Sequence, residues 1–223
     1  MNKALKSNVI IMLGTPGSGK GTQTRLLEHE FALNYFAPGD AIRTIIKEGT
    51  DKFAKTVKDR YNRGQPQPDT VVNTIVKKAL VGMNLQKGII LDPYPLSVGQ
   101  AQGFMELKRE LHLQDPVILS LHVGEEETVR RLSQRKFCEE CHLMHLPTDK
   151  EYTDNICKRC AGALYVRPDD APSVVRYRYQ EYQKRIGEIK QFFDDINPTW
   201  WIDINGEQDI EQVYKEIIKE ITM

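Results

Sequence analysis

The sequence predicts an α/β protein in which a parallel sheet is flanked by helices and interrupted by two insertions. Short apolar runs typical of buried strands alternate along the chain with segments that have the apolar spacing of amphipathic helices. A glycine-rich turn joins the first such run to the first helix. Two stretches, one polar and one rich in cysteine, break this pattern, and we therefore expect them to lie outside the core.

The first half of the chain supplies two expected strands. Residues 9–13 are apolar and mainly β-branched and end at Gly14, which indicates a buried strand that leads into a turn. Apolar residues between Val71 and Leu80 keep the spacing of a buried helix face. In order, the expected elements are a strand at 9–13, a helix from Lys20 to about Asn34, a helix at 41–46, a helix at 71–80 and a strand at 89–91 that is followed by Asp92.

The second half continues the alternation of strand and helix. A strand at 117–123 precedes three glutamates, which favour a helix start because anionic side chains stabilise the positive end of the helix dipole. The other expected elements are a helix carrying Phe104, Leu107 and Leu111, a long helix carrying residues 174–193, a strand at 200–204 and a closing amphipathic helix at 210–221. Aromatic residues of this last third are expected in the core.

The charge balance excludes several classes of partner. Thirty-one basic residues stand against thirty-one acidic ones, so the net charge is zero and no excess of charge attracts nucleic acid or an anionic membrane. The apolar run at 9–13 is far shorter than the roughly 20 residues that span a bilayer, and no signal-peptide pattern follows it. We therefore expect a cytoplasmic protein whose anion-binding sites are local.

Residues 14–20 read Gly-Thr-Pro-Gly-Ser-Gly-Lys, the G-x-x-x-x-G-K spacing of a phosphate-binding loop. The segment lies after an expected strand and before an expected helix, which is the context that this motif requires. Glycines let backbone N–H groups surround phosphate oxygens, and Lys20 is placed to bind the outer phosphates. Gly21 stands where the strict pattern has a hydroxyl, and Thr22 comes one residue later, so the hydroxyl on the Mg²⁺ side is the less defined part of the motif.

All four cysteines lie in one short segment of the chain. Two residues separate the members of each close pair and fifteen lie between the pairs, a C-x₂-C-x₁₅-C-x₂-C arrangement typical of metal sites. Two such knuckles predict a tetrahedral set of thiolates that binds Zn²⁺ in a structural role, because no position is left open. Iron fits the same geometry, and ligation by His142 or His145 and a redox disulfide are weaker alternatives. The expected ligands are Cys138, Cys141, Cys157 and Cys160.

Further motifs follow the loop in a fixed order. They are Gly39-Asp40 with Arg43, Leu91-Asp92 with Tyr94-Pro95 and Gln100, Arg131 with Arg135, the four cysteines, Arg167 with Asp169-Asp170, and Arg178. Together with residues 14–23 this series closely resembles adenylate kinases, of the nucleoside monophosphate kinase family, and in particular their bacterial type with a zinc-bearing lid. The resemblance spans nearly the whole chain and implies the P-loop NTPase fold and a monomer.

The resemblance implies a division of the chain and a reaction. It implies a core that binds ATP with Mg²⁺ at 1–37, 68–131 and 171–223, an insertion that binds the nucleoside monophosphate (NMP) at 38–67 and a zinc-binding lid at 132–170. The implied reaction is phosphoryl transfer from ATP to an NMP, by default AMP, so that two ADP form. Such transfer depends on positioning and charge neutralisation, for which arginine is suited.

The resemblance also implies roles for individual residues. The implied catalytic residues are Lys20, Arg135, Arg167 and Arg178. The implied ATP-binding residues are Gly17, Ser18, Gly19, Lys20, Gly21, Thr22, Arg131, Arg135 and Gln208, and the implied acceptor-binding residues are Gly39, Arg43, Gln67, Gln100, Arg167 and Arg178. Asp92 is implied to hold Mg²⁺ through water, which suits a cation that keeps its waters. Asp169 and Asp170 are similar to the acids at the family's lid hinge.

Three positions depart from the family pattern on the acceptor side. Leu96 stands where the family usually has an arginine on the acceptor phosphate, so acceptor binding is expected to suffer unless another cation, such as Arg43 or Arg60, takes over. Pro38 lacks the hydroxyl and N–H expected near the acceptor base, and Gln67 stands where an aliphatic residue commonly lines the adenine. Two alternatives stay open: a kinase for another NMP or dNMP, and a catalytically weakened nucleotide-binding protein.

Overall fold

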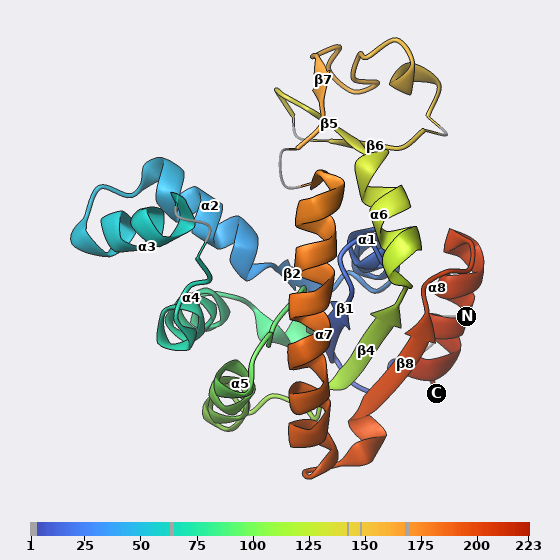
Figure 1. The fold of residues 1–223 in the computed structure, drawn as a ribbon. Helices are drawn as coiled ribbons and strands as arrows, with labels where there is room; N and C mark the ends of the chain where they lie inside the picture. Colours follow the sequence, from blue (N-terminus) through green and yellow to red (C-terminus); the bar gives the residue numbers. More distant parts are fainter. Residues whose placement is uncertain (1–3, 63–64, 142, 148, 168–169) are drawn as a thin grey trace.

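The structure is a computed structural model that describes residues 4–62, 65–141, 143–147, 149–167 and 170–223. Its centre is a five-stranded sheet in which every neighbouring pair of strands is parallel. The strands are β1 (Val9–Gly14), β2 (Asn34–Phe36), β3 (Ile89–Leu91), β4 (Val117–His122) and β8 (Trp201–Asn205), in the spatial order β2-β3-β1-β4-β8 (Figure 1). The predicted parallel α/β fold is confirmed.

Helices connect these strands. The α-helices are α1 (Lys20–Phe31), α2 (Pro38–Glu48), α3 (Lys52–Asn62), α4 (Asp69–Val81), α5 (Val98–Glu110), α6 (Glu125–Ser133), α7 (Pro172–Asp194) and α8 (Ile210–Ile221), and the 3₁₀ helices are η1 (Leu85–Lys87), η2 (Lys150–Tyr152) and η4 (Pro198–Trp200). α7 and α8 match the predicted periodic segments, except that Val174 and Ile210 are exposed. Over the described ranges, no helix is long and apolar enough to cross a membrane.

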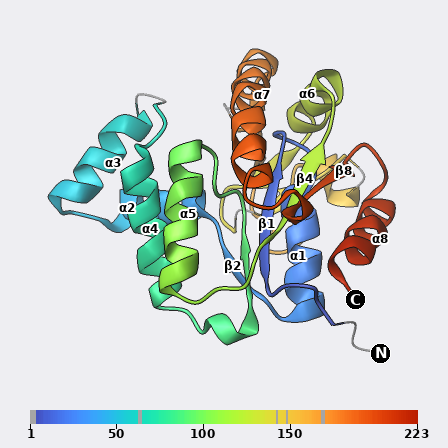
Figure 2. The same ribbon diagram turned by 90° about the horizontal axis from the view of Figure 1, so that it is seen from below.

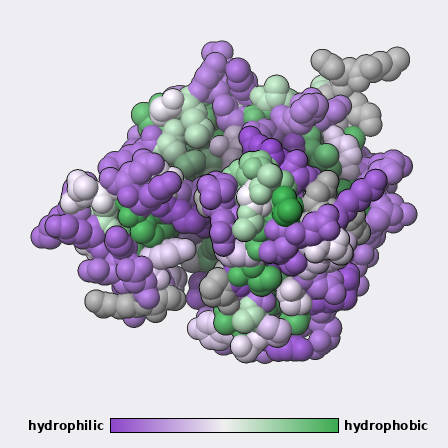
Figure 3. Space-filling model, turned by 90° about the horizontal axis from the view of Figure 1, so that it is seen from above, coloured by the Kyte–Doolittle hydropathy of each residue, from purple (hydrophilic) through white to green (hydrophobic). Residues whose placement is uncertain are grey.

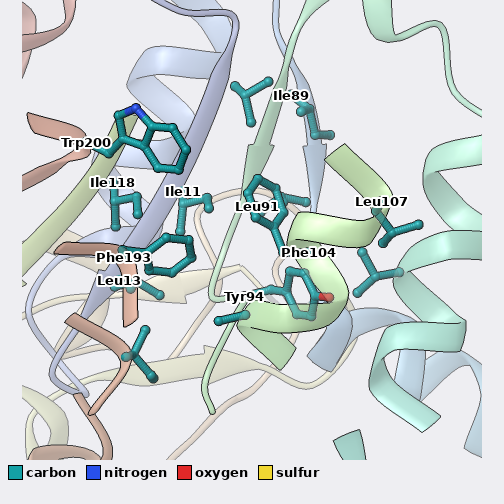
Figure 4. Packing of buried hydrophobic residues seen from close by; sticks show 14 of the residues in the cluster. Ile11, Leu13, Ile89, Leu91, Tyr94, Phe104, Leu107, Ile118, Phe193 and Trp200 are labelled. Atoms are coloured by element: carbon teal, nitrogen blue, oxygen red, sulfur yellow. The ribbon is translucent and has the colours of Figure 1, made fainter. Parts of the chain in front are cut away.

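The sheet has a hydrophobic core on each face, because successive side chains of a strand point in opposite directions. Odd-numbered residues of β1 pack with α4, α5 and α7, and in this cluster Phe104 and Phe193 meet edge to face with 6.4 Å between ring centroids (Figure 4). Ile10 and Met12 pack on the other face against α1 and α8, which lie together on that side of the sheet in Figure 2. The sheet is therefore covered on both faces, as a parallel sheet requires.

Two parts of the chain extend away from this core. The helices α2 and α3 form a lobe that projects to the left in Figure 1. At the top, the chain between α6 and α7 forms a separate antiparallel sheet of β6 (Met144–His145), β5 (Lys136–Cys138) and β7 (Leu164–Tyr165), in that spatial order. In the view from above, a hollow separates the α2–α3 lobe from the rest of a mostly hydrophilic surface (Figure 3).

The structure differs from the sequence prediction in the first third of the chain. α1 ends at Phe31, before the predicted end near Asn34, because Ala32 adopts the left-handed conformation (φ 51°) that stops a helix. Asn34 begins β2, an edge strand that is too short for a period of two to be recognised. The polar stretch after α2 contains α3. This helix was not predicted from the sequence because Ala54 and Val57 are its buried residues, and two such positions give too weak an apolar periodicity to recognise.

Candidate active site

The loop between β1 and α1 lies at the carboxyl end of the central strand, beside the end of β4. Its glycines have positive φ angles of 151° at Gly14, 75° at Gly17 and 90° at Gly19, the residue before α1. A Cβ atom at Gly14 would also lie 2.4 Å from the carbonyl oxygen of Leu121. Glycine is therefore required for this tight turn. The turn leads into the N-terminus of α1, and a helix N-terminus after a glycine-rich loop is a common anion-binding site.

Lys20 is the first residue of α1 and turns back over this loop. Its Nζ donates hydrogen bonds of 2.8 and 2.9 Å to two backbone oxygens of the loop. Removal of the ammonium group from bulk water lowers the pKa of Lys20 to about 8. The Asp92 carboxylate opposes this shift, whereas Arg178 and Arg135 add to it. The loop, one carboxylate and two arginines therefore belong to one electrostatic site.

Asp92 follows β3 directly and is buried, with 7% of the residue exposed. The hydroxyl of Thr24, on α1, donates a hydrogen bond of 3.2 Å to its carboxylate. Burial raises the pKa of Asp92, while Lys20 and the Thr24 hydroxyl lower it. The structure thus brings this carboxylate to the carboxyl ends of the strands, where ligands of open α/β sheets bind.

A buried carboxylate holds two of the predicted arginines. Arg135, which follows α6, donates from Nε and Nη2 to the two oxygens of Asp170, each at 2.7 Å. The side chain of Asp170 is fully buried, and Nη1 of Arg178, on α7, lies 3.9 Å from its Oδ1. The two guanidinium groups therefore meet at one carboxylate between α6 and α7. Asp169, its companion in the sequence motif, lies outside the described residues.

Arg167 approaches the same group of residues from the small sheet. It follows β7, and its guanidinium carbon lies 3.7 Å from the centroid of the Phe137 ring, on β5. The guanidinium carbon of Arg135 lies 5.0 Å from the centroid of the same ring. The predicted arginines Arg135, Arg167 and Arg178 are thereby gathered around one carboxylate and one aromatic ring.

Arg131 and Gln208 lie by the turn between β8 and α8. Arg131, on α6, donates from Nη1 to the carbonyl oxygen of Gly206 in that turn at 2.8 Å. Gln208 is held there by hydrogen bonds of 3.2 Å to a backbone oxygen and 2.7 Å to a glutamate of α8. A Cβ atom at Gly206 would lie 3.0 Å from the backbone oxygen of Ser18, so this turn packs directly on the phosphate loop.

The predicted acceptor-side residues lie on other elements. Gly39 and Arg43 are on α2, where Arg43 forms an ion pair with Asp40. Gln67 lies between α3 and α4, and its Nε2 donates to a backbone oxygen of α3 at 2.9 Å, which ties the connecting segment to the α2–α3 lobe. The structure thus places these three residues on or next to the lobe, and it places Gln100 on α5.

Leu96 precedes α5 and packs against the core. Its backbone N–H donates to Oε1 of Gln100 at 2.8 Å, and Nε2 of Gln100 donates to Asp69 at 3.0 Å. Arg60, one of the two cations expected to compensate for the missing arginine, donates from Nε and Nη2 to the backbone oxygen of Pro66, at 3.1 and 2.9 Å. Two of its donor nitrogens are therefore engaged within the lobe.

The cysteine thiols meet beside the small sheet, with all four Sγ atoms within 4.8 Å of one another. The Sγ atoms of Cys138 and Cys160 are 3.4 Å apart, and those of Cys141 and Cys157 are 3.5 Å apart. Metal–sulfur bonds of about 2.3 Å in a tetrahedral site separate the sulfurs by roughly 3.8 Å. The cluster therefore fits one four-coordinate metal ion, as the spacing in the sequence predicts.

His145 lies behind the thiols, and its ring is fully buried with Nδ1 3.6 Å from the carboxylate of Asp149. Desolvation opposes ionisation of the Cys157 thiol, but hydrogen bonds, first among them the one that the backbone N–H of Arg159 donates to Sγ at 3.4 Å, outweigh it and lower the pKa of Cys157 to about 6. This donor favours the thiolate, the form that binds metal. His142, the other histidine weighed as a ligand, lies outside the described residues.

Sequence reasoning missed two residues of this site. Phe137 contacts both Arg135 and Arg167, and its one sequence signal is its position between an arginine and the first cysteine. Thr24 supports Asp92 from a helix distant in sequence, and a threonine inside a helix gives no such signal. Both contacts join elements that only the folded chain brings together.

The fold and this site define the class of the protein: a P-loop nucleotide-binding protein. A family model described as adenylate kinase matches residues 12–197. Curated proteins named adenylate kinase are similar over almost their whole length. One from Archaeoglobus fulgidus is 34% identical over 93% of this chain and 95% of the relative, and one from Dehalococcoides mccartyi is 36% identical over 95% and 97%. The chain belongs to the adenylate kinase family, and it is a nucleoside monophosphate kinase, a phosphotransferase.

Proposed function

We propose that this chain transfers the γ-phosphoryl group of ATP to a nucleoside monophosphate, with AMP as the acceptor, so that ATP and AMP give two ADP. Membership of the adenylate kinase family supports this reaction. The structural observation that carries it is the convergence of Lys20, Arg135 and Arg178, since both arginines are near enough to lower the pKa of the lysine. A protein that only bound nucleotide would need the loop but not these arginines.

The two nucleotides are proposed to use different parts of the site. The loop backbone and Lys20 bind the phosphates of ATP, and Arg131 and Gln208, next to the loop, bind toward its adenine. The proposed ATP-binding set is Gly17, Ser18, Gly19, Lys20, Gly21, Thr22, Arg131, Arg135 and Gln208, and the proposed acceptor set is Gly39, Arg43, Gln67, Gln100, Arg167 and Arg178. The position of the 205–208 turn on the phosphate loop supports the ATP side of this assignment.

The arginines are proposed to act by charge neutralisation and positioning. Arg135, Arg167 and Arg178 present planar groups of N–H donors, which bind phosphate oxygens in pairs and stay charged. Mg²⁺ bound with ATP supplies further positive charge on the phosphates. Asp92 is proposed to hold that ion through water, and its buried carboxylate beside Lys20 supports this role.

We propose that the chain is divided into a core (1–37, 68–131 and 171–223), an NMP-binding part (38–67) and a lid (132–170). The α2–α3 lobe and the separate sheet of β5, β6 and β7 support these boundaries. A lid over the loop would exclude water, which otherwise competes with the acceptor for the phosphoryl group. Four free thiols and the family support a cytoplasmic location.

The lowered pKa of Lys20 predicts that affinity for ATP depends on pH. Below about pH 8 the ammonium is charged before ATP arrives, whereas above it the free protein must first take up a proton. We expect the Kd for ATP to be flat below pH 8 and to rise up to about tenfold per pH unit above it. Calorimetric titrations of wild type and Lys20→Arg, whose side chain stays charged, measure this. The same pH slope in both proteins would contradict the prediction.

Specific alternatives exist for the acceptor nucleotide and for the level of catalysis. Leu96, Pro38 and Gln67 favour either another NMP or dNMP as acceptor or a protein that binds nucleotide with weakened catalysis. Coupled turnover of ATP against AMP, GMP, CMP, UMP and the dNMPs separates these readings. Turnover with AMP alone supports the proposed reaction. Turnover with a different nucleotide instead of AMP shows that this nucleotide is the acceptor. Clear ATP binding without turnover on any acceptor overturns the kinase reaction.

We expect the variant Leu96→Arg to raise kcat/KM for AMP by about 10- to 100-fold, because a hydrogen bond to a charged group contributes about 1.5–3 kcal/mol. The present leucine supplies no charge, and its side chain is only partly buried against the core. Steady-state kinetics with varied AMP measure the gain. Leu96→Met is the matched control, since it changes the side chain without adding charge. An unchanged KM for AMP in Leu96→Arg would show that another cation already neutralises the acceptor phosphate.

We propose that the four cysteines bind one Zn²⁺ in a structural role. Four thiol ligands within 4.8 Å of one another leave no open coordination position, which supports a structural ion. Among the described residues of the surrounding segment, few apolar residues are buried, chiefly Phe137, Leu164 and two of the cysteines, so a metal would supply much of its stability.

The zinc proposal predicts one Zn²⁺ per chain by elemental analysis and its loss in Cys157→Ser. Without the ion we expect backbone amides of residues 136–165 to lose protection from hydrogen exchange while those of the central sheet keep it. Glu140→Ser, an exposed position in the first knuckle, is the control and should retain both metal and protection. A native preparation that holds no metal and is fully protected would refute the structural role.

A further inference from the structure

The ring of Phe137 lies against two of the arginines that the proposed reaction requires. The guanidinium carbon of Arg167 is 3.7 Å from the ring centroid, which is close stacking, and that of Arg135 is 5.0 Å from it. Phe137 itself is 6% exposed, so the ring is shielded from water on the sides that the arginines do not cover. A cation is attracted to a desolvated aromatic face more strongly than to an exposed one.

The position of the ring is fixed by the small sheet. Phe137 is the middle residue of β5, the central strand, and it pairs with Met144 of β6 and Tyr165 of β7. The rings of Phe137 and Tyr165 also pack together, with 6.4 Å between centroids. The next residue is Cys138, whose thiol belongs to the four-cysteine cluster. The orientation of the ring is therefore tied to the metal-binding part of the chain.

An aromatic face holds a guanidinium group in a different way from a carboxylate. Asp170 occupies Nε and Nη2 of Arg135, so phosphate oxygens would have to displace it from those donors. A ring that stacks on the flat face of a guanidinium leaves the N–H donors, which point outward in the plane, free to bind phosphate. It also adds no negative charge that would repel the nucleotide.

We propose that Phe137 is a positioning residue for phosphoryl transfer, holding Arg167 and, more weakly, Arg135 with their N–H donors directed to the transferring group. The inference rests on the proposed kinase function. It also links the metal cluster to the reaction, because β5 carries Phe137 and Cys138 side by side. Loss of the ring removes the platform while leaving every charged residue in place.

The kinetic test compares Phe137→Leu with Phe137→Tyr. We expect Phe137→Leu to lower kcat by about 5- to 30-fold with little change in the KM for ATP, and Phe137→Tyr, which keeps the aromatic face, to restore most of the loss. Tyr152→Leu is the matched control: its ring lies 4.2 Å from the ammonium of Lys136, so this variant removes a cation–π contact of the same segment that involves none of the arginines. Its kcat should stay within twofold of wild type.

A double-mutant cycle tests whether Phe137 acts through Arg167. In the Arg167→Lys background, Phe137→Leu should have a much smaller effect on kcat than in wild type, because the group that the ring positions is already altered. An equal fold-loss of kcat in both backgrounds would overturn the proposal, and so would a kcat for Phe137→Leu within twofold of wild type. Hydrogen exchange of the backbone amides of residues 136–165 identifies a variant that merely loosens the segment, because such a variant loses protection there; that loss in Phe137→Leu would also overturn the proposal.

A spectroscopic readout is independent of turnover. A proton over an aromatic face is shifted upfield by the ring current, so side-chain resonances of Arg167, assigned by their loss in Arg167→Lys, should move downfield in Phe137→Leu and stay upfield in Phe137→Tyr. If no acceptor supports turnover in wild type, the proposed function fails while this measurement still decides the position of the ring. Identical shifts in wild type and Phe137→Leu would overturn the inference whatever the activity.

Discussion

Replacing Lys20 with methionine is expected to lower kcat/KM for ATP by about a thousandfold, since removal of a single donor to developing charge costs about 10²–10³ and this donor is also cationic. Methionine has a similar length and shape but no charge. The Nζ of Lys20 is held by two backbone oxygens of the loop, so it already lies where the proposed function places the phosphates of ATP. Steady-state kinetics with varied ATP, and ATP binding by calorimetry, measure the loss.

The control for this variant is Lys219→Met, which removes an exposed lysine of α8 far along the chain from the loop. We expect its kinetics to match those of wild type. We also expect Lys20→Met to unfold at a temperature no lower than wild type, because a desolvated ammonium is replaced by an apolar group. A loss of kcat/KM below tenfold in a folded Lys20→Met protein would remove the lysine from the proposed machinery.

Replacing Asp170 with alanine is expected to lower the melting temperature by roughly 6–20 °C, on the basis of about 3–5 kcal/mol for breaking a buried ion pair in a chain of this size. Asp170 is fully buried and accepts both hydrogen bonds of Arg135, while Arg178 lies 3.9 Å away. Without the carboxylate, two guanidinium groups face each other with no anion between them. Thermal unfolding followed by circular dichroism measures the effect.

Glu126→Ala is the matched comparison for Asp170→Ala. Glu126 also pairs with an arginine of α7, Arg176, but its side chain is 81% exposed. Exposed ion pairs contribute about 0–1 kcal/mol, so this variant should melt within a few degrees of wild type. Equal decreases in the melting temperature of the two variants would mean that burial of Asp170 does not set the strength of its interaction with the arginines.

Much of the core could be predicted from the sequence because its strands are apolar at consecutive positions. Residues 9–13 alternate between the two hydrophobic clusters, and a run that is apolar on both faces is recognisable without knowledge of its neighbours. The strand β2 could not be recognised, since its three residues are intermediate or exposed and, among the described strands, pair with β3 alone. The helix α3 was missed because most of its surface is polar.

The site was predictable where chemistry depends on local spacing. The glycines of the loop and the paired cysteines are each close in sequence, so their geometry follows from a short stretch of backbone. Contacts between distant elements were not predictable from spacing. The stacking of Arg167 on Phe137 requires β5 and β7 to pair across the cysteine segment, and the bidentate contact of Arg135 with Asp170 joins the ends of that same segment.

The hydrogen bonds of Lys20 to its own loop have a consequence for which small molecules can occupy it. Because the ammonium group is already bonded to backbone oxygens at 2.8 and 2.9 Å, an incoming ligand gains only the difference between its own contacts and these. A weak anion such as chloride, or one terminal phosphate alone, offers little advantage over two carbonyl groups. A triphosphate offers several anionic oxygens at once, so, in the proposed function, the hydrogen bonds of Lys20 to its own loop favour ATP over anions that carry a single charge.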